Sequence, residues 1–173
     1  MTSTIPLLEV RNLSVSFGAT SVVNRISFTL NRGETLALVG ESGSGKSVSD
    51  LSILQLLPYP HAHHPDGSIL LHGEELLGAD AKRLREVRGN QIAMIFQEPM
   101  TSLNPLHSIE KQISETLILH KGLRGAPLRA QILELLDWVG LPEAANRLNA
   151  LPHELSGGQR QRVALARALV IRP

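Results

Sequence analysis

The sequence predicts an α/β fold, and three features of the chain support this prediction. Residues 35–39 form an unbroken apolar run between two glycines, which is typical of a strand buried on both faces of a sheet. A glycine-rich stretch follows at once, and helical spacing of apolar residues begins after it. Residues 108–151 have a helical pattern, so we expect a sheet-based core with a separate helical lobe.

The N-terminal part of the chain alternates between apolar and polar residues, as an antiparallel sheet edge does. The alternating segments are 7–10, 13–17 and 27–30, with a turn at 31–34. A helix is expected from Lys46 to Pro58, because a proline disfavours helical backbone at the residue before it. Further strands are expected at 68–71 and at 92–96, of which the second has the composition of another buried strand.

The second half of the chain is predicted to be helical. Helices are expected at 109–120, at 127–139 and from Pro142, and a last helix begins after Ser156. This last helix carries one apolar stripe flanked by arginines. The predicted division is a core at 1–106, a helical lobe at 107–155 and a helix that returns to the core at 156–173.

Composition limits the partners that the chain can have. Lys and Arg number 17 and Asp and Glu 16 among 173 residues, so the net charge of +1 gives no global attraction to nucleic acid or anionic membranes. The absence of cysteine excludes disulfides and thiolate metal sites within these residues. Residues 1–9 lack a secretory-signal pattern, and the longest apolar stretch, 163–171, is too short to cross a bilayer. We expect a protein that is neither exported nor membrane-spanning.

The glycine-rich stretch matches the phosphate-binding pattern Gly-x-x-x-x-Gly-Lys-Ser at every fixed position. Its residues are Gly40, Glu41, Ser42, Gly43, Ser44, Gly45, Lys46 and Ser47. Glycines let backbone N–H groups point at phosphate oxygens, and the start of the next helix adds about half a positive charge. Lys46 is expected to reach the β and γ phosphates, and Ser47 to coordinate Mg²⁺. Kinases, GTPases, helicases and transport ATPases share this loop, so a second motif is needed to distinguish these classes of protein.

That second motif consists of Leu155, Ser156, Gly157, Gly158 and Gln159. A serine hydroxyl and two glycine N–H groups at a helix start make another anion site, compact enough to lie against a γ-phosphate. Together with its continuation through 160–169, the motif closely resembles the signature of ABC-type ATPases. The order of the two motifs along the chain agrees with that family.

The resemblance covers residues 7–173 and implies a P-loop NTPase core with an N-terminal antiparallel β edge and an inserted helical lobe. It implies ATP and Mg²⁺ as ligands. Phe17 corresponds to the aromatic residue that stacks on adenine, and Gln97 to the glutamine that senses Mg²⁺ and the attacking water. In ABC proteins the signature of one subunit closes over the nucleotide held by the other. A head-to-tail pair with a second ABC ATPase subunit or half is therefore implied.

Two segments, 96–106 and 152–155, resemble the branch of this family that imports dipeptides, oligopeptides or nickel. Within this branch, 40–49 together with 84–105 resemble the microcin C and peptide importer ATPases. The branch implies a peripheral subunit on the cytoplasmic face of the plasma membrane, where ATP hydrolysis drives uptake of a peptide-like solute. Transmembrane permease subunits would dock near 97–106 and on the lobe, and a solute-binding protein would act indirectly. No nucleic-acid partner is expected.

The resemblance also implies residues that the sequence does not supply. After the signature, ABC ATPases have an apolar strand ending in Asp, then a Glu that activates water, and later a His at the γ-phosphate. The 173 residues end before these positions. The run 132–137 precedes the signature in a helical pattern, and Glu98 falls in the glutamine loop, so neither is a substitute. We expect an N-terminal part of a longer polypeptide that lacks the last core strands and does not turn over ATP alone.

Other readings stay open. A non-transport ABC ATPase acting on DNA or ribosomes has the same two motifs, as does a nucleotide-binding fragment without catalysis; the segment 96–106 favours the importer. His61, His63 and His64 suggest a metal site, but a solvated loop is the favoured interpretation. The arginines near the signature are interpreted as a solvated helix face because charge is balanced and aromatic residues are few. They are Arg160, Arg162, Arg167 and Arg172.

Overall fold

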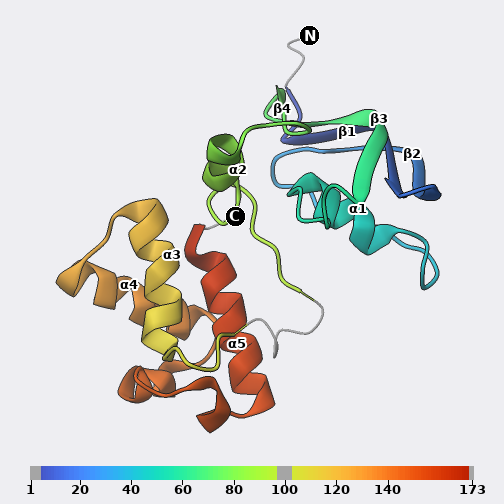
Figure 1. The fold of residues 1–173 in the computed structure, drawn as a ribbon. Helices are drawn as coiled ribbons and strands as arrows, with labels where there is room; N and C mark the ends of the chain where they lie inside the picture. Colours follow the sequence, from blue (N-terminus) through green and yellow to red (C-terminus); the bar gives the residue numbers. More distant parts are fainter. Residues whose placement is uncertain (1–4, 97–102, 172–173) are drawn as a thin grey trace. The chain divides into compact units, whose positions relative to one another are not determined.

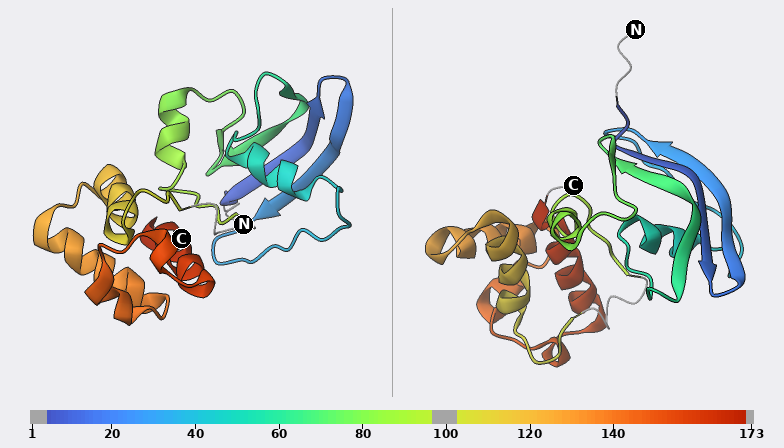
Figure 2. Two further views of the ribbon diagram at one scale, coloured as in Figure 1. Left: turned by 60° about the horizontal axis from the view of Figure 1, so that its bottom comes forward. Right: turned by 45° about the horizontal axis from the view of Figure 1, so that its top comes forward.

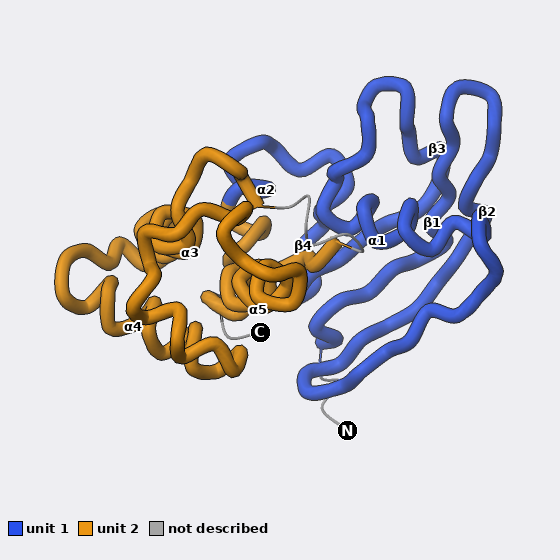
Figure 3. Tube along the Cα trace, turned by 90° about the horizontal axis from the view of Figure 1, so that it is seen from below, with its two compact units in different colours: residues 1–85 blue, residues 86–173 orange. Residues whose placement is uncertain are grey.

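The chain folds into two compact units, unit 1 (Met1–Arg85) and unit 2 (Glu86–Pro173), shown in blue and orange in Figure 3. The computed structural model describes residues 5–96 and 103–171. Unit 1 is built on a β-sheet, and unit 2 is helical. The sequence predicts three parts that differ in their role: core, helical lobe and returning helix. The two compact units do not test these roles, so the three-part division stays a prediction.

Unit 1 contains a four-stranded antiparallel sheet in the order β2-β1-β3-β4 (Figure 1). Its strands are β1 (Leu8–Phe17), β2 (Thr20–Leu30), β3 (Ala62–Leu71) and β4 (Glu74–Glu75). The predicted antiparallel edge is confirmed, with longer strands than the alternation indicates. The strands bury one apolar face, as an antiparallel sheet does. The buried residues include Leu8, Val10, Leu13, Val15, Val23, Ile69 and Leu71.

The helix after the glycine-rich stretch is α1 (Lys46–Ile53), which packs against β1 and β2 (Figure 2). It is shorter than predicted, because Leu54 leaves the helical conformation and Gln55 has a φ of 48°. Leu54 and Leu57 are nevertheless buried, so the chain continues to cover the sheet after the helix ends. A short helix that was not predicted, α2 (Ala81–Val87), spans the boundary of the two units.

Two predicted strands are absent from the described residues, and both predictions are wrong. The run 35–39 has no regular secondary structure, and its apolar side chains are exposed, with Val39 at 92%. Residues 92–96 form only an isolated parallel bridge between Arg88 and Ile92, and Ile95 is 53% exposed. A strand buried on both faces needs a neighbouring strand to take its hydrogen bonds. No strand in the described part of the chain pairs with either segment.

Unit 2 confirms the predicted helices. They are α3 (Ile109–Lys121), α4 (Gly125–Trp138) and α5 (Gly157–Ala168), joined by the short 3-10 helices η2 (Pro142–Arg147) and η3 (Pro152–Glu154), with η4 (Leu169–Ile171) after α5. The Ser108 side chain caps α3 by accepting from Lys111 N, and Gly122 ends this helix with a φ of 64°. Among the described residues, no helix has the length and apolar character needed to span a membrane.

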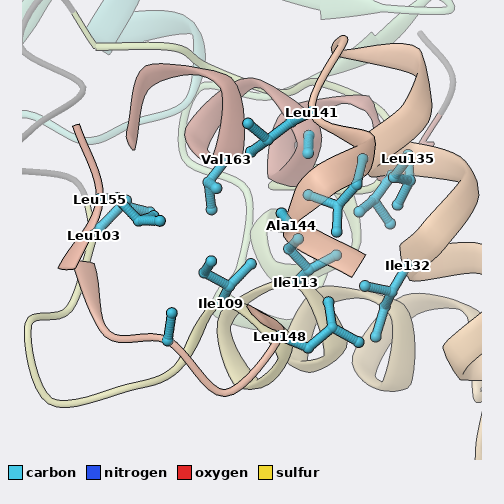
Figure 4. Close-up of a cluster of buried hydrophobic side chains, with 14 of the residues drawn as sticks. Leu103, Ile109, Ile113, Ile132, Leu135, Leu141, Ala144, Leu148, Leu155 and Val163 are labelled. Atoms are coloured by element: carbon cyan, nitrogen blue, oxygen red, sulfur yellow. The ribbon is translucent and has the colours of Figure 1, made fainter. Parts of the chain in front are cut away.

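The three helices of unit 2 pack on one another around a single apolar cluster (Figure 4). Its residues recur at helical spacing, so each helix turns one apolar stripe inward. The cluster includes Leu103, Ile109, Ile113, Leu117, Ile132, Leu135, Leu136, Leu141, Val163, Ala166 and Val170. Leu155 of the second motif also belongs to it, which anchors the start of α5 to the core of the unit.

One buried polar residue, Gln112, ties α3 to the segment before it. Its Oε1 accepts from Asn104 N at 2.9 Å, and its Nε2 donates to Asn104 O at 3.1 Å and His107 O at 2.8 Å. A buried amide is tolerated only when its hydrogen bonds are satisfied. Gln112 therefore holds residues 104–107 against α3.

Candidate nucleotide-binding site

The glycine-rich stretch forms an exposed loop that ends at the start of α1. Gly45 is the N-cap of α1 with a φ of 88°, a conformation that residues with a Cβ rarely adopt. A Cβ on Gly45 would lie 3.0 Å from Val22 O and 3.0 Å from Val23 Cγ2, so the loop is pressed onto β2. A Cβ on Gly40 would lie 2.7 Å from Ser44 Oγ. The left-handed backbone and the contact with β2 require glycine at position 45, whereas at position 40 rotation of the Ser44 side chain would make room for a Cβ.

Lys46 folds back over this loop. Its Nζ donates to Gly40 O at 2.7 Å, to Glu41 O at 2.6 Å and to Ser44 Oγ at 3.1 Å. All three acceptors are uncharged, whereas a phosphate oxygen carries negative charge and forms a stronger, charge-assisted hydrogen bond with an ammonium group. The ammonium is thus held at the loop, where a phosphate would compete for it.

Hydrogen-bond donors at the start of α1 complete the site. The N–H groups of Lys46, Ser47 and Val48 have no acceptor among the described residues, as expected for the first turn of a helix. Ser47 is exposed, and its hydroxyl has no partner in the described parts of the chain. Backbone donors, one ammonium and one accessible hydroxyl lie together at the start of α1, and these groups fit a triphosphate with Mg²⁺.

Ser49 supports the loop from α1, a role that the sequence analysis missed. Its backbone N and its Oγ both donate to Gly45 O, each at 2.9 Å, and the side chain is buried. The four-residue spacing between Gly45 and Ser49 was the available signal, because serine in a helix often bonds to the carbonyl four residues earlier. The two bonds fix the carbonyl of the N-cap and hence the entry of the loop into the helix.

Phe17 is the last residue of β1, where it pairs with Thr20 of β2 and Ala62 of β3. Its side chain is half-buried, and its ring lies beside that of His61, with 5.9 Å between the centroids and a tilt of 59°. Unit 1 therefore contains both the phosphate-type loop and the predicted adenine-stacking aromatic residue. The stacking role itself stays a prediction.

The second motif forms the N-terminus of α5 in unit 2. Ser156 is the N-cap, with Ser156 Oγ accepting from Gln159 N at 3.2 Å and Gln159 Oε1 accepting from Ser156 N at 3.0 Å. Gly157 and Gly158 form the exposed first turn, and a Cβ on Gly158 would meet nothing within 4 Å. The Ser156 hydroxyl accepts one bond as the cap, and its own proton is free of any acceptor in the described residues. An anion can therefore approach this turn.

The arginines of α5 match the expected solvated face only in part: Arg162 is exposed, whereas Arg160 and Arg167 are half-buried. Arg160 Nε donates to Leu155 O at 3.2 Å, and Arg162 donates to Gly140 O, so both tie α5 to neighbouring segments. Arg167 is half-buried; burial lowers the pKa of its guanidinium, and Glu115 opposes that change. The solvated-face interpretation is wrong for Arg167 because its side chain packs into unit 2. Arg172 lies outside the described residues.

The remaining predicted positions give a mixed result. Gln97, the predicted water- and Mg²⁺-sensing residue, lies outside the described residues, as do Glu98 and most of 97–106. Within the described ranges, no group of three or more His, Cys, Asp or Glu side chains can hold a metal ion. His64 has a pKa lowered by burial and by the neighbouring His63, so its ring is uncharged at neutral pH.

Comparison with known proteins decides the family. The family described as ABC transporter matches residues 23–173. The chain belongs to the ABC transporter family. Over 99% of its length this ABC chain is 62% identical to the peptidoglycan transport ATP-binding protein YejF of Agrobacterium fabrum. Over 96% it is 46% identical to the oligopeptide transport ATP-binding protein OppD of Bacillus subtilis. The predicted resemblance to peptide-importer ATPases is confirmed.

Solved ABC structures confirm the fold class. The ABC chain superposes on the ATP-binding cassette MJ0796, a dimer in a post-hydrolysis state with ADP and Pi, with a TM-score of 0.80 and 28% identity over 96% of its length. It superposes on cbiO1 of Clostridium perfringens, part of the cbiONQ complex, with a TM-score of 0.76 and 26% identity over 97%. It covers 70% and 62% of these two chains, respectively.

The ABC chain is shorter than its relatives. It spans 32% of the length of the Agrobacterium YejF protein and 48% of OppD. The phosphate loop and the signature lie in separate compact units of the ABC chain, and each presents helix-start donors within its own unit.

Proposed function

We propose that this chain is part of the ATP-binding subunit of an ABC importer, in which ATP binding and hydrolysis drive uptake of a peptide-like solute. The observation that carries the proposal is the loop at 40–47, where the Lys46 ammonium and the helix-start N–H groups, which have no acceptor among the described residues, lie together as donors for a phosphate. The relatives named for oligopeptide and peptidoglycan transport support the solute class.

Lys46, Ser47 and the backbone at the start of α1 have distinct roles in this proposal. Backbone N–H groups at the start of α1 bind phosphate oxygens, and Lys46 leaves the carbonyls of Gly40 and Glu41 to bind the β and γ phosphates. The Ser47 hydroxyl holds Mg²⁺, which when bound neutralises phosphate charge. Phe17 stacks on the base, and Gln97 orients water. Hydrolysis is proposed for the full-length protein, and nucleotide binding without turnover for the 173-residue chain.

The signature completes the site of a second ATPase subunit or half in a head-to-tail pair. The exposed first turn of α5 offers the Gly157 and Gly158 N–H groups and the Ser156 hydroxyl to a γ-phosphate. Because α5 starts with a helix dipole and carries no acidic residue in its first turn, negative charge is favoured there. ATP would thus join the two partners.

This pairing predicts the behaviour of two Ser156 variants. Ser156→Arg should leave Mg-ATP binding by the monomer unchanged but abolish ATP-dependent pairing, because a long side chain fills the approach to α5. Ser156→Asp keeps a good N-cap but sets a negative charge against the γ-phosphate, and should also abolish pairing. Light scattering after gel filtration, with and without Mg-ATP, measures the change from the monomer mass of 18.8 kDa.

Gln161→Arg is the matched control, since it adds the same charge to an exposed position on the same helix. It should pair like the unmodified chain. Pairing that survives in both Ser156 variants would contradict the role of the signature. Removing an N-cap costs about 1 kcal/mol of helix stability, so α5 could unfold in a Ser156 variant. Far-UV circular dichroism checks that the helix content of each variant is unchanged.

The importer class is tested by uptake in cells. We propose that the protein is peripheral on the cytoplasmic face of the plasma membrane, that permease subunits dock on the segment 97–106 and the helical lobe, and that a solute-binding protein delivers the solute. Cells carrying Lys46→Ala in the full-length protein should take up labelled tripeptides at the rate of a deletion strain, while Lys82→Ala cells should match the unmodified strain. Normal uptake with a DNA-repair or translation defect would favour the non-transport ABC class instead.

A further inference from the structure

Unit 1 places a histidine beside the predicted base-stacking residue. The ring centroids of Phe17 and His61 lie 5.9 Å apart at a tilt of 59°, a separation typical of interacting aromatic rings. His61 is exposed and Phe17 is half-buried, so solvent reaches both rings. Two tilted and accessible rings form an open corner, which we call the Phe17–His61 corner.

The backbone of the sheet holds this corner in place. Gly18 N donates to His61 O at 3.0 Å, directly after Phe17 pairs with Ala62. The His61 ring also covers the Gly18 backbone, since a Cβ on Gly18 would lie 3.7 Å from His61 Cε1. Both rings are therefore positioned by hydrogen-bonded strand ends, and not by long free side chains.

The corner lies close to the phosphate loop along the same strands. The loop presses on Val22 and Val23 of β2, and Val23 pairs with Val15 of β1. Phe17 follows two residues after Val15, which is about 7 Å along a strand. A nucleotide whose phosphates occupy the loop can thus direct its base toward the Phe17–His61 corner.

We propose that His61 is a second base-contacting residue, which together with Phe17 receives the purine of ATP in this corner. The inference rests on the proposed function and adds a residue to its site. Phe17 offers a ring face for stacking, while the imidazole offers an aromatic edge with one nitrogen donor and one acceptor when neutral. A purine edge carries matching donors and acceptors, so His61 adds polar recognition to stacking.

The neighbouring histidines fit this role less well. His63 pairs with Ser16 of β1, and in the described part of the chain no ring contact joins it to Phe17. His64 packs its ring on Tyr59, with centroids 5.7 Å apart. Of the three histidines, only His61 shares the corner.

The test compares two ligands that differ in the base. Isothermal titration of the protein with Mg-ATP and with magnesium tripolyphosphate separates base contacts from phosphate contacts. His61→Ala should weaken Mg-ATP binding about 3- to 10-fold, the size of one lost hydrogen bond, and leave tripolyphosphate binding unchanged. His61→Phe keeps the ring without its nitrogens and should recover part of the loss. His63→Ala is the matched control and should bind both ligands normally.

The outcomes are distinct. Normal Mg-ATP affinity in His61→Ala would overturn this inference alone, and an equal loss for both ligands would overturn it as well by showing that His61 only supports the sheet. If the unmodified protein binds neither ligand, the proposed function fails and this inference with it. A loss confined to Mg-ATP, with partial recovery in His61→Phe, supports the Phe17–His61 corner.

Discussion

Replacement of Lys46 by alanine is expected to remove most of the Mg-ATP affinity, by about 100-fold or more. Hydrogen bonds to a charged group contribute about 1.5–3 kcal/mol each, and Lys46 is expected to reach two phosphates. The structure adds that Lys46 already makes three hydrogen bonds to its own loop, so the alanine variant also loses the contacts that hold Gly40, Glu41 and Ser44 together. Isothermal titration measures the affinity directly.

Two further lysine variants separate charge from geometry. Lys46→Arg keeps the positive charge but replaces the ammonium with a wider, planar guanidinium. The Lys46 ammonium fits between two carbonyl oxygens, with Nζ 2.7 Å from Gly40 O and 2.6 Å from Glu41 O. The arginine variant should therefore bind Mg-ATP nearly as poorly as the alanine variant. Lys82→Ala removes a charge from an exposed position of α2 and should bind normally. Unchanged affinity in Lys46→Ala would show that the loop is not the nucleotide site.

Truncation of Ile113 is expected to have the largest effect on stability. This side chain is 0% exposed on α3 and belongs to the apolar cluster that joins α3, α4 and α5. Removing a fully buried isoleucine side chain leaves a cavity, and Ile113→Ala should lower the free energy of unfolding by about 2–5 kcal/mol. Urea unfolding followed by circular dichroism at the helix band measures the loss, because the long helices lie in unit 2.

Leu119→Ala is the matched control on the same helix. Leu119 is 66% exposed, and substitutions at such surface positions change stability by about 0.5 kcal/mol or less. A similar midpoint for both variants would contradict the packing of α3 in Figure 4. Since α5 packs on α3, loss of Ile113 should also weaken the signature turn and ATP-dependent pairing.

The helices of unit 2 were predictable because their signals are local. Ser108 caps α3, Gly122 ends it, and Ser156 caps α5 with Gln159 in a reciprocal pair. The buried strands were not predictable in the same way. An apolar run such as 35–39 has the composition of a buried strand, but it becomes one only when another segment pairs with it.

The candidate site follows the same rule. Gly45, Lys46 and Ser47 were identified from spacing alone, since the loop is a contiguous segment whose glycines and lysine must follow one another. Ser49 was missed because its role is visible only once α1 has formed. The sequence alone favours a solvated loop for His61, which lies 44 residues after Phe17 in the chain. The two residues become neighbours only when β1 pairs with β3.

The sequence by itself determined the family, the two glycine-containing motifs and the helices of unit 2, because each depends on residues within a few positions of one another. The tertiary structure decided which strands pair, where Lys46 rests and which ring lies beside Phe17. These features depend on hydrogen bonds and packing between distant segments. Such contacts form only when a distant segment lies alongside in the folded sheet, and the spacing of residues within one segment does not specify which segment that is.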